Sequence, residues 1–497
     1  MIRYLSQSHP ASLLLALLLL HGSAHAQAEG QSVQPMISSQ IEELRAEVQQ
    51  LRQLVEQQQR VLQAMQKRTD EREVASQAGA ARSVPPANVR SDSGTAAPRQ
   101  SAASASNAAE TPDQASPPAG WNGNRFFIRS PDSRFQSDII GYAQLDFHGY
   151  QSGNHPPNTF LIRRARLGVE GRLERYFDYK VEGDFSDTNS TLLRDLYARI
   201  HRTDAFQLSF GQFRVPISQE EMRFDAVQDF VERSMVNSLV PSRSPGLMAS
   251  GILAKRVFEY QIGAFNGKGL LATNNNGTPE TALRVRLSPW KNRKSVWGDG
   301  FSFGGAFTTG RNVGGDSVRG QTESRSFIFF TPETVNGKQT RANGELTWML
   351  GPAALRAEYD QTNQERRQLG ADGTDLPGVV AKGYMAQVTY LLTGETKPEA
   401  GAVAPRLELF REGAGRAGLG AWELKLRYAN LYIADGSPKS NRAETLFFGV
   451  NWYMNRFISH MVDFGFERFK DRLRTPRPGD GNFFVLLSRL QVTFSAR

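Results

Sequence analysis

The feature that most constrains this chain is an alternation of apolar and polar residues, repeated many times between residues 121 and 497. In FDYKVEGDFS, residues 177–186, an aromatic residue, valine or glycine fills every odd position and a charged residue or serine every even one. Successive side chains of a β-strand point to opposite faces, so this period of two predicts strands with one apolar and one charged face. We therefore expect this region to be all-β.

The length and number of these runs favour a membrane-spanning barrel over a soluble sandwich. Several runs have about ten residues, which is what a tilted strand needs to cross a bilayer, whereas a sandwich uses fewer and shorter strands. We count seventeen runs, and treating residues 326–330 as part of an outer loop leaves sixteen, an even number. The clearest are residues 139–149, 161–173, 177–186, 192–202, 206–212, 283–287, 344–350, 355–359, 422–428 and 483–494.

The connections between the runs alternate between short and long. Bacterial barrels have short periplasmic turns and long outer loops, so the alternation supports a barrel with both chain ends in the periplasm. One predicted inner link, residues 393–420, is unusually long. The longest predicted outer connections cover residues 218–246, 311–338 and 361–383.

The first 120 residues have a different composition. The apolar run ASLLLALLLL and the small-residue site AHA predict a signal peptide over residues 1–26. After a short lead, residues 27–36, apolar residues spaced alternately four and three apart predict a periplasmic coiled-coil helix over residues 37–68, interrupted once by Gln58. Residues 69–120 are rich in Ala, Ser and Pro and are predicted to be a disordered linker. The barrel domain is expected over residues 121–497.

The charge and the residue types exclude several functions. The chain has no cysteine, so it has neither disulfides nor thiolate metal sites. Residues 121–497 hold 49 Lys and Arg against 39 Asp and Glu, so the excess positive charge belongs to the barrel. This charge is spread over strands of an exported protein, which argues against nucleic-acid binding. No histidine has the neighbours that a catalytic site needs and no cluster has metal-ligand spacing, so we expect no enzyme activity and no cofactor.

The alternation also predicts which charged side chains face the lumen. Leu167 and Val169 mark the lipid face of their strand, so Arg164, Arg166 and Arg172 point inward. Arg284 and Arg286 behave likewise. Inward arginines concentrate anions, and the planar guanidinium binds two oxygens of an oxyanion. The alternative is that these arginines only solvate the wall and pair with carboxylates such as Glu170.

Eight motifs, in order, resemble the phosphate-selective porin family of the O and P type over residues 137–494. They are RRARLGVEG, FGQFRVPIS, VERS, GELTWMLGPAALRAEY, YLLTGE, GAWELKLRY, GVNWYMN and RLQVTF. The resemblance implies a homotrimer of sixteen-stranded barrels, a third outer loop folded inward as a constriction, and arginines along the anion path. In this chain the path would contain Arg163, Arg164, Arg166, Arg172, Lys180, Arg214, Arg223, Arg233, Arg243, Arg284 and Arg286.

The chain departs from that family at two basic positions. Glu221 follows Glu220 in the expected constriction loop where phosphate-selective members carry a lysine, and Asp178 occupies another of their lysine positions. We count these three acids as constriction residues and expect only a modest anion preference. The terminal aromatic, Phe494, is also followed by three further residues.

The sequence thus predicts a passive outer-membrane porin that favours small anions, with outer-membrane lipid and small anionic solutes as its partners. Its coiled coil, residues 37–68, which we call the arm, would lie in the periplasm. A general or nutrient-specific porin for sugars or organic acids is the alternative. An envelope-tethering or adhesin-like role of the arm is a third possibility.

Overall fold

The computed structural model of the protein describes residues 118–151, 157–186, 192–293, 295, 297–409, 418–436 and 441–494. The predicted signal peptide, lead and coiled coil, and the linker as far as residue 117, lie outside these residues and remain predictions. Ala119 and Gly120, which the sequence analysis assigned to the linker, already belong to a short strand.

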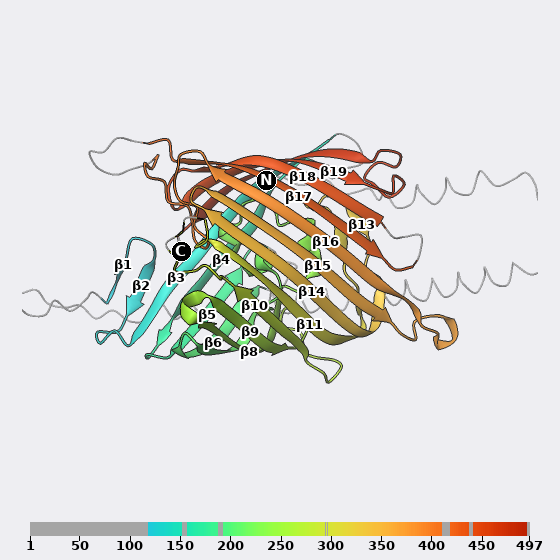
Figure 1. Ribbon diagram of the computed structural model, residues 1–497, viewed down its shortest axis with the longest axis horizontal. Coiled ribbons are helices and arrows are strands. Elements are labelled where there is room, and N and C mark those ends of the chain that lie inside the picture. The colour runs from blue at the N-terminus through green and yellow to red at the C-terminus, as the bar shows by residue number, and fades with distance from the viewer. Residues whose placement is uncertain are drawn as a thin grey trace, which may run out of the picture. The chain divides into compact units, whose positions relative to one another are not determined.

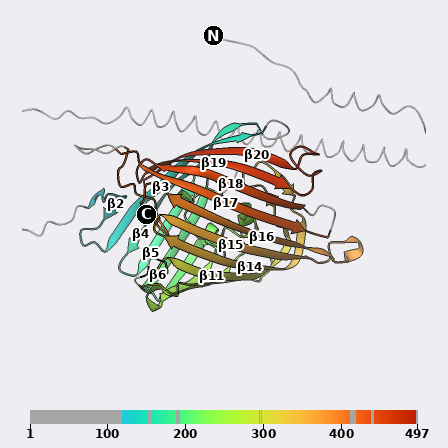
Figure 2. The same cartoon turned by 45° about the horizontal axis from the view of Figure 1, so that its top comes forward.

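Sixteen antiparallel strands form a closed barrel (Figures 1 and 2). Each strand pairs with the next along the chain, except that β11 pairs with β14, and the barrel closes where β20 pairs with β3. Its strands are β3 (Phe135–Tyr150), β4 (Thr159–Leu173), β5 (Phe177–Asp184), β6 (Leu193–Thr203), β7 (Phe206–Arg214), β8 (Arg243–Leu253), β9 (Phe258–Phe265), β10 (Glu280–Leu287), β11 (Phe301–Asp316), β14 (Thr334–Leu350), β15 (Ala353–Arg366), β16 (Leu376–Leu391), β17 (Ala421–Ala434), β18 (Asn441–Tyr453), β19 (Ile458–Phe469) and β20 (Asn482–Thr493).

The structure also has short strands and helical turns outside the sixteen barrel strands. The hairpin of β1 (Ala119–Trp121) and β2 (Phe126–Arg129) pairs with the start of β3. Strands β12 (Gly320–Gln321) and β13 (Ile328–Phe330) form a separate two-stranded sheet, so residues 326–330 belong to a loop as predicted. The helical turns are α2 (Gln219–Met222), η1 (Asp225–Val227), η2 (Met235–Leu239), η3 (Ala254–Arg256) and η4 (Ala371–Gly373). No helix of the described part of the chain is long and apolar enough to span a membrane.

The barrel wall reverses the arrangement of a soluble protein. On β5 the apolar Phe177 and Val181 are exposed on the outside, whereas Lys180 and Glu182 are buried in the lumen. The same reversal recurs around the wall, for example on β17, where the exposed Leu424 and Leu426 alternate with the buried Lys425 and Arg427. Lipid would cover the apolar face, so the period-two prediction of an apolar outer and a charged inner face is confirmed.

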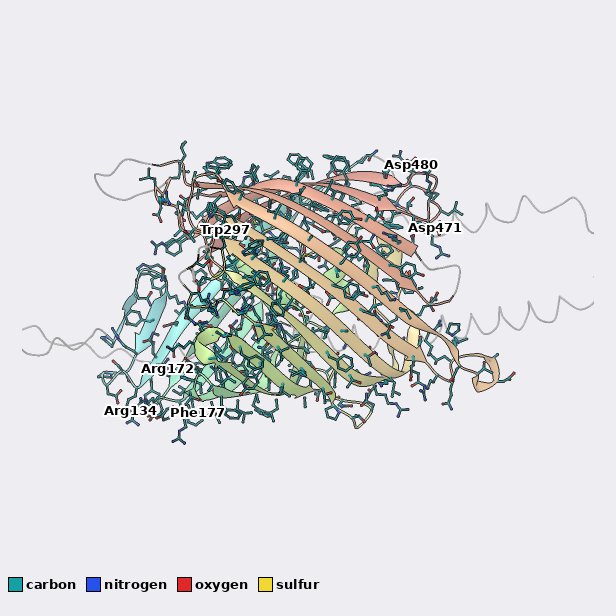
Figure 3. The ribbon with its side chains drawn as sticks, in the orientation of Figure 1. Arg134, Arg172, Phe177, Trp297, Asp471 and Asp480 are labelled. Atoms are coloured by element: carbon teal, nitrogen blue, oxygen red, sulfur yellow. The ribbon has the colours of Figure 1, made fainter. Side chains whose placement is uncertain are left out.

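The two ends of the barrel differ. Figure 3 shows Arg172 and Phe177 at the end with the short turns, and Asp471 and Asp480 at the opposite end. Both the start of β3 and the end of β20 lie at the first end, which makes it the periplasmic end of a bacterial barrel. All six tryptophans of the chain belong to elements or links at this end, and the rings of Trp422 and Trp452 stack 5.3 Å apart. Tryptophan prefers the membrane interface, so this belt marks the inner boundary of the bilayer.

The outer connections are shorter than the sequence analysis expected. Strand β11 continues to Asp316 and β14 begins at Thr334, so much of the predicted loop 311–338 is strand. Strand β16 likewise begins at Leu376, inside the predicted loop 361–383. Neighbouring strands continue their backbone pairing beyond the apolar band, and loss of the lipid-facing pattern there does not end the strand.

The hydrophobic core lies inside the barrel. Met235, Val236 and Leu239 of η2 pack on apolar side chains that point inward from the outer halves of β16–β20, together with Phe329 and Phe330 of β13. A second cluster joins Phe230 and Val231 to inward residues of β18–β20. The third outer loop, residues 215–242, is therefore buried in the lumen.

Candidate functional site

The inserted loop is fixed to the wall opposite its own strands. Ser218 caps α2 by accepting a hydrogen bond from the Glu221 backbone amide at 3.1 Å. The Gln219 side-chain amide then donates to the carbonyl oxygens of Leu346 on β14 and Ala357 on β15, at 3.2 and 2.7 Å. The loop leaves β7, crosses the lumen and narrows it.

Asp225 is the centre of one buried charge cluster. Its carboxylate lies 2.6 Å from Arg166, 2.7 Å from Arg214 and 2.7 Å from Arg233, with Arg164 at 3.8 Å. Burial opposes ionisation of Asp225, but these guanidinium groups outweigh it and hold its pKa well below the ordinary range. One loop carboxylate thus ties together wall and loop arginines.

Asp229 is the centre of a second cluster. Its carboxylate lies 2.7 Å from Arg356, 2.8 Å from Arg223 and 2.9 Å from Lys397, and accepts a hydrogen bond from the Gln387 amide at 2.7 Å. Burial again opposes ionisation, and Arg223, Lys397 and Arg356 lower the pKa of Asp229 well below the ordinary range. The loop is therefore charged at both anchors at neutral pH.

Lys397 comes from the long inner link between β16 and β17. It also lies 2.5 Å from Glu423, and Val403 of the same link packs in an apolar cluster with Leu391 and Ala421. The periplasmic link thus enters the lumen from below and meets the outer loop at Asp229.

A β-bulge decides the position of Arg163. Gln144 pairs with Arg164 and Leu145 with Ile162, so Arg163 is the extra residue of β4. Two consecutive arginines can then face the lumen, where Arg163 binds Glu232 of the loop and Arg164 donates to Gln144 at 2.8 Å. Strict alternation would place Arg163 in the lipid.

The remaining predicted arginines and lysine lie around the wall and each meets an acid. Lys180 and Arg243 share Asp195, at 3.0 and 2.6 Å. Arg214 and Arg243 face each other across β7 and β8, so Asp225 and Asp195 separate two like charges.

Three predicted residues lie toward the periplasmic mouth. Arg284 lies 2.6 Å from Glu345, and Arg286 binds Glu399 of the inner link. Arg172 lies 3.7 Å from Asp178, whose carboxylate also lies 2.7 Å from a ring nitrogen of His201.

The three predicted constriction acids do not lie together. Glu220 and Glu221 lie in α2: Glu220 is 3.2 Å from Arg427, and Glu221 accepts hydrogen bonds from Ser242 and Asn237 at 2.7 and 3.1 Å. Asp178 instead lies at the periplasmic end of β5.

A cavity of about 700 Å³ lies between the loop and strands β9, β10, β14 and β15 of the wall. Its loop side has Met222, Phe224 and Val227, and the inner link contributes Glu399. Its cations are Arg223, Arg256, Arg284, Arg286, Lys291 and Arg356, against the acids Glu259, Glu345 and Glu399. The lining is therefore more basic than acidic.

The sequence profile of the family described as phosphate-selective porin O and P matches residues 132–494. The chain belongs to this family. It is also 28% identical over 417 residues to Porin O of Pseudomonas aeruginosa, covering 74% of this chain and 90% of the relative. This porin is accordingly a passive channel of the Gram-negative outer membrane and not an enzyme.

Solved structures similar to this porin have low sequence identity. One is an anion-selective porin from Comamonas acidovorans, with 11% identity, a TM-score of 0.45 and coverage of 72% of this chain and 99% of the other. Another is the outer-membrane channel DcaP of Acinetobacter baumannii, with 11% identity, a TM-score of 0.47 and coverage of 74% and 99%.

Several charged residues of this porin were missed by the sequence analysis. Lys425 contacts Asp463 and donates to the carbonyl of Asp229 at 2.9 Å, and Arg427 binds both Glu220 and Glu323. Arg489 forms two bonds of 2.7 Å with Asp146. Lys425, Arg427 and Arg489 lie in motifs that carry the family resemblance, and their inward positions in the alternation could have identified them.

One group of described side chains has the spacing of a metal site. Ligand atoms of Asp146, His148 and Glu232 lie within 4.8 Å of one another. Both carboxylates already bind arginines, Arg489 and Arg163, which occupy the positions that a cation would need.

Proposed function

We propose that this porin passes small anions with a modest preference over cations and without a high-affinity phosphate site. The observation that carries the proposal is the pairing of the wall arginines in the constriction. Asp225 and Asp229 each contact three cations directly, so arginines expected along the path are already bound to carboxylates of the loop. A phosphate ion would have to replace these carboxylates.

The remaining positive charge supports an anion preference. Arg256 and Lys291 form no ion pair with any described residue, although both line the cavity. A cavity with low-dielectric walls and an excess of one charge concentrates the opposite ion. Arg163, Arg164, Arg166, Arg172, Lys180, Arg214, Arg223, Arg233, Arg243, Arg284 and Arg286 remain our proposed anion path, with Arg172, Arg284 and Arg286 nearest the periplasmic mouth.

Glu221 is the proposed residue that separates this porin from a phosphate-specific one. It lies in the loop 3.5 Å from Arg233, and the pKa of its buried carboxyl is lowered by Arg233, Arg214 and Arg243 in spite of burial. Replacing Glu221 by Gln keeps the shape of the side chain and removes one negative charge beside these three arginines, which makes the constriction more favourable for an anion.

Planar-bilayer recordings test the proposal. We expect a reversal potential that shows weak anion selectivity and no block of chloride current by micromolar phosphate. Glu221→Gln should raise anion selectivity, and the Arg164→Ala, Arg166→Ala double variant should lower it. Asp480→Asn, in an exposed outer loop, is the control for the loss of one acid. Micromolar phosphate block of the wild type would contradict the proposal.

We also propose a homotrimer. In the part of the wall from β5 to β10, strands β5, β7, β9 and β10 have only eight or nine residues each and β6 and β8 have eleven, whereas β11, β14 and β16 have sixteen or seventeen. A tilted strand of eight residues rises only about 21 Å, less than the apolar band of about 25 Å. Neighbouring copies of the chain would cover the side of the wall that has these short strands. Chemical cross-linking in detergent should then produce trimers.

A further inference from the structure

Basic side chains project from the outside of the barrel at its extracellular end. Lys382 of β16 lies opposite Tyr432 of β17, and Tyr432 lies opposite Arg442 of β18. The backbone of Lys470, just beyond β19, donates a hydrogen bond of 2.9 Å to the Arg442 carbonyl. Lys382, Arg442 and Lys470, which we call the outer basic row, thus cross four neighbouring strands with one tyrosine between them.

The outer basic row lies on the lipid side of the wall and not in the lumen. Along β18, Arg442 shares its face with the exposed Leu446 and Phe448, while the intervening residues are buried inside. The outer ends of β16, β17, β18 and β19 lie together at one end of the barrel (Figure 1). This end is opposite to the periplasmic end, where β3 begins and β20 ends. The rings of Tyr384 and Tyr428, 6.0 Å apart, lie on the same face and nearer to the middle of the wall.

A second basic group continues this end of the wall. Arg311 of β11 lies opposite Lys338 of β14, and both are exposed. Arg367, just after β15, lies 2.8 Å from Glu365. Two surface hollows of about 410 and 430 Å³ share Lys338, Glu365 and Arg367 in their linings.

The cations of both groups outnumber the acids beside them. Arg442 lies 3.1 Å from Glu444, and Arg367 pairs with Glu365, but Arg311, Lys338, Lys382 and Lys470 form no ion pair with any described residue. The periplasmic end of the same outer face has tryptophans instead, such as the stacked Trp422 and Trp452. The outer leaflet therefore faces basic side chains, whereas the inner leaflet faces tryptophans.

We propose that the outer basic row and the Arg311–Lys338–Arg367 group bind the phosphate groups of the glycolipid that forms the outer leaflet. Tyrosines next to the apolar band fit the headgroup boundary, and lysines and arginines just above them fit anionic headgroups. The spread of the cations over β11 to β19 fits many lipid molecules packed side by side around the wall. A solute in the lumen cannot reach these residues, because they project to the other side of the wall.

The test compares binding of bisphosphorylated lipid A to the purified protein in a neutral detergent. The readout is the rise in thermal unfolding temperature as lipid A is added. The variant is Lys382→Gln, Arg442→Gln, Lys470→Gln, and its matched control is Arg175→Gln, Arg202→Gln, Lys255→Gln, three exposed cations at the periplasmic end of the barrel. Unchanged single-channel conductance shows that each variant has folded.

We expect half-maximal stabilisation of the row variant to need at least about tenfold more lipid A than the wild type and the control, because each cation near an anionic surface contributes measurably to binding. Equal lipid A dependence of the row variant and the wild type would overturn the proposal. Two further results would do the same: equal stabilisation by dephosphorylated lipid A, which would show contact through acyl chains alone, or equal stabilisation by inorganic phosphate, which would show an ion site and not a lipid site.

Discussion

Replacing Asp225 by Asn should loosen the constriction and raise anion selectivity. The substitution keeps the size of the side chain and removes the charge that Arg166, Arg214 and Arg233 contact at 2.6–2.7 Å. At an effective dielectric constant of about 20, two unit charges about 4 Å apart attract each other by about 4 kcal/mol. Desolvation offsets most of this gross attraction, but removing one member of a buried pair costs about 3–5 kcal/mol.

That cost falls on the docking of the loop and not on the barrel. The backbone pairing of the sixteen strands does not involve Asp225, which lies in η1 of the loop. We therefore expect an assembled barrel with an unchanged thermal transition of the sheet, a larger single-channel conductance and more open-channel noise.

The effect on selectivity follows from the lost charge. A unit charge about 10 Å from the ion path, screened over one Debye length at 0.1 M salt, changes the energy of an ion by about 0.15 to 0.6 kcal/mol, depending on the local dielectric constant. Anions gain and cations lose this energy, so the anion-to-cation permeability ratio should rise about two- to eightfold.

The assay is the reversal potential across a planar bilayer under a salt gradient, with conductance recorded for the same channels. Asp480→Asn removes one acid from an exposed outer loop and should leave both values unchanged. If Asp225→Asn behaved like Asp480→Asn in selectivity, conductance and noise, Asp225 would not set the constriction and the reasoning would be refuted.

Three further predictions concern the loop, the inner link and the arm. The lowered pKa values of Asp225 and Asp229 mean that their contribution to loop docking is fully present above their ordinary pKa of 3.8 and is lost as the pH falls through the depressed values. The difference in conductance between the wild type and Asp225→Asn should therefore stay constant from pH 7 to about pH 4 and shrink only below it, and loss of this difference near pH 6 would contradict the assignment. Lys397→Gln removes the charge that links the inner link to Asp229 and Glu423, so recordings should show a larger conductance than for the wild type, whereas Lys470→Gln, outside the lumen, should leave conductance unchanged. Val48→Pro should abolish the predicted coiled coil of residues 37–68 because proline removes a backbone hydrogen bond and clashes with the preceding turn; circular dichroism and sedimentation of residues 31–68 measure this, and a wild-type segment that is a non-helical monomer would remove the coiled-coil prediction.

Much of the constriction could not be predicted from the alternation alone. Arg163 reaches Glu232 because of a bulge, which changes the register by one residue without a signal in the pattern. Phe447 and Leu431 are apolar residues at inward positions, where the alternation of a water-filled barrel predicts polar ones. They are inward and apolar because the inserted loop covers them.

The wall of this porin could be predicted from the sequence alone, including its strand count, its apolar outer face and the basic excess of the barrel. These properties follow from the pleat of each strand and from the composition of each face, which are local and repeat along the chain. Which carboxylate pairs with which arginine depends on the tertiary structure. Asp225 meets Arg166 and Asp229 meets Lys397 because a loop and an inner link from distant parts of the sequence enter the same lumen. Such contacts depend on where the loop crosses the barrel, and the period of two contains no information about that path.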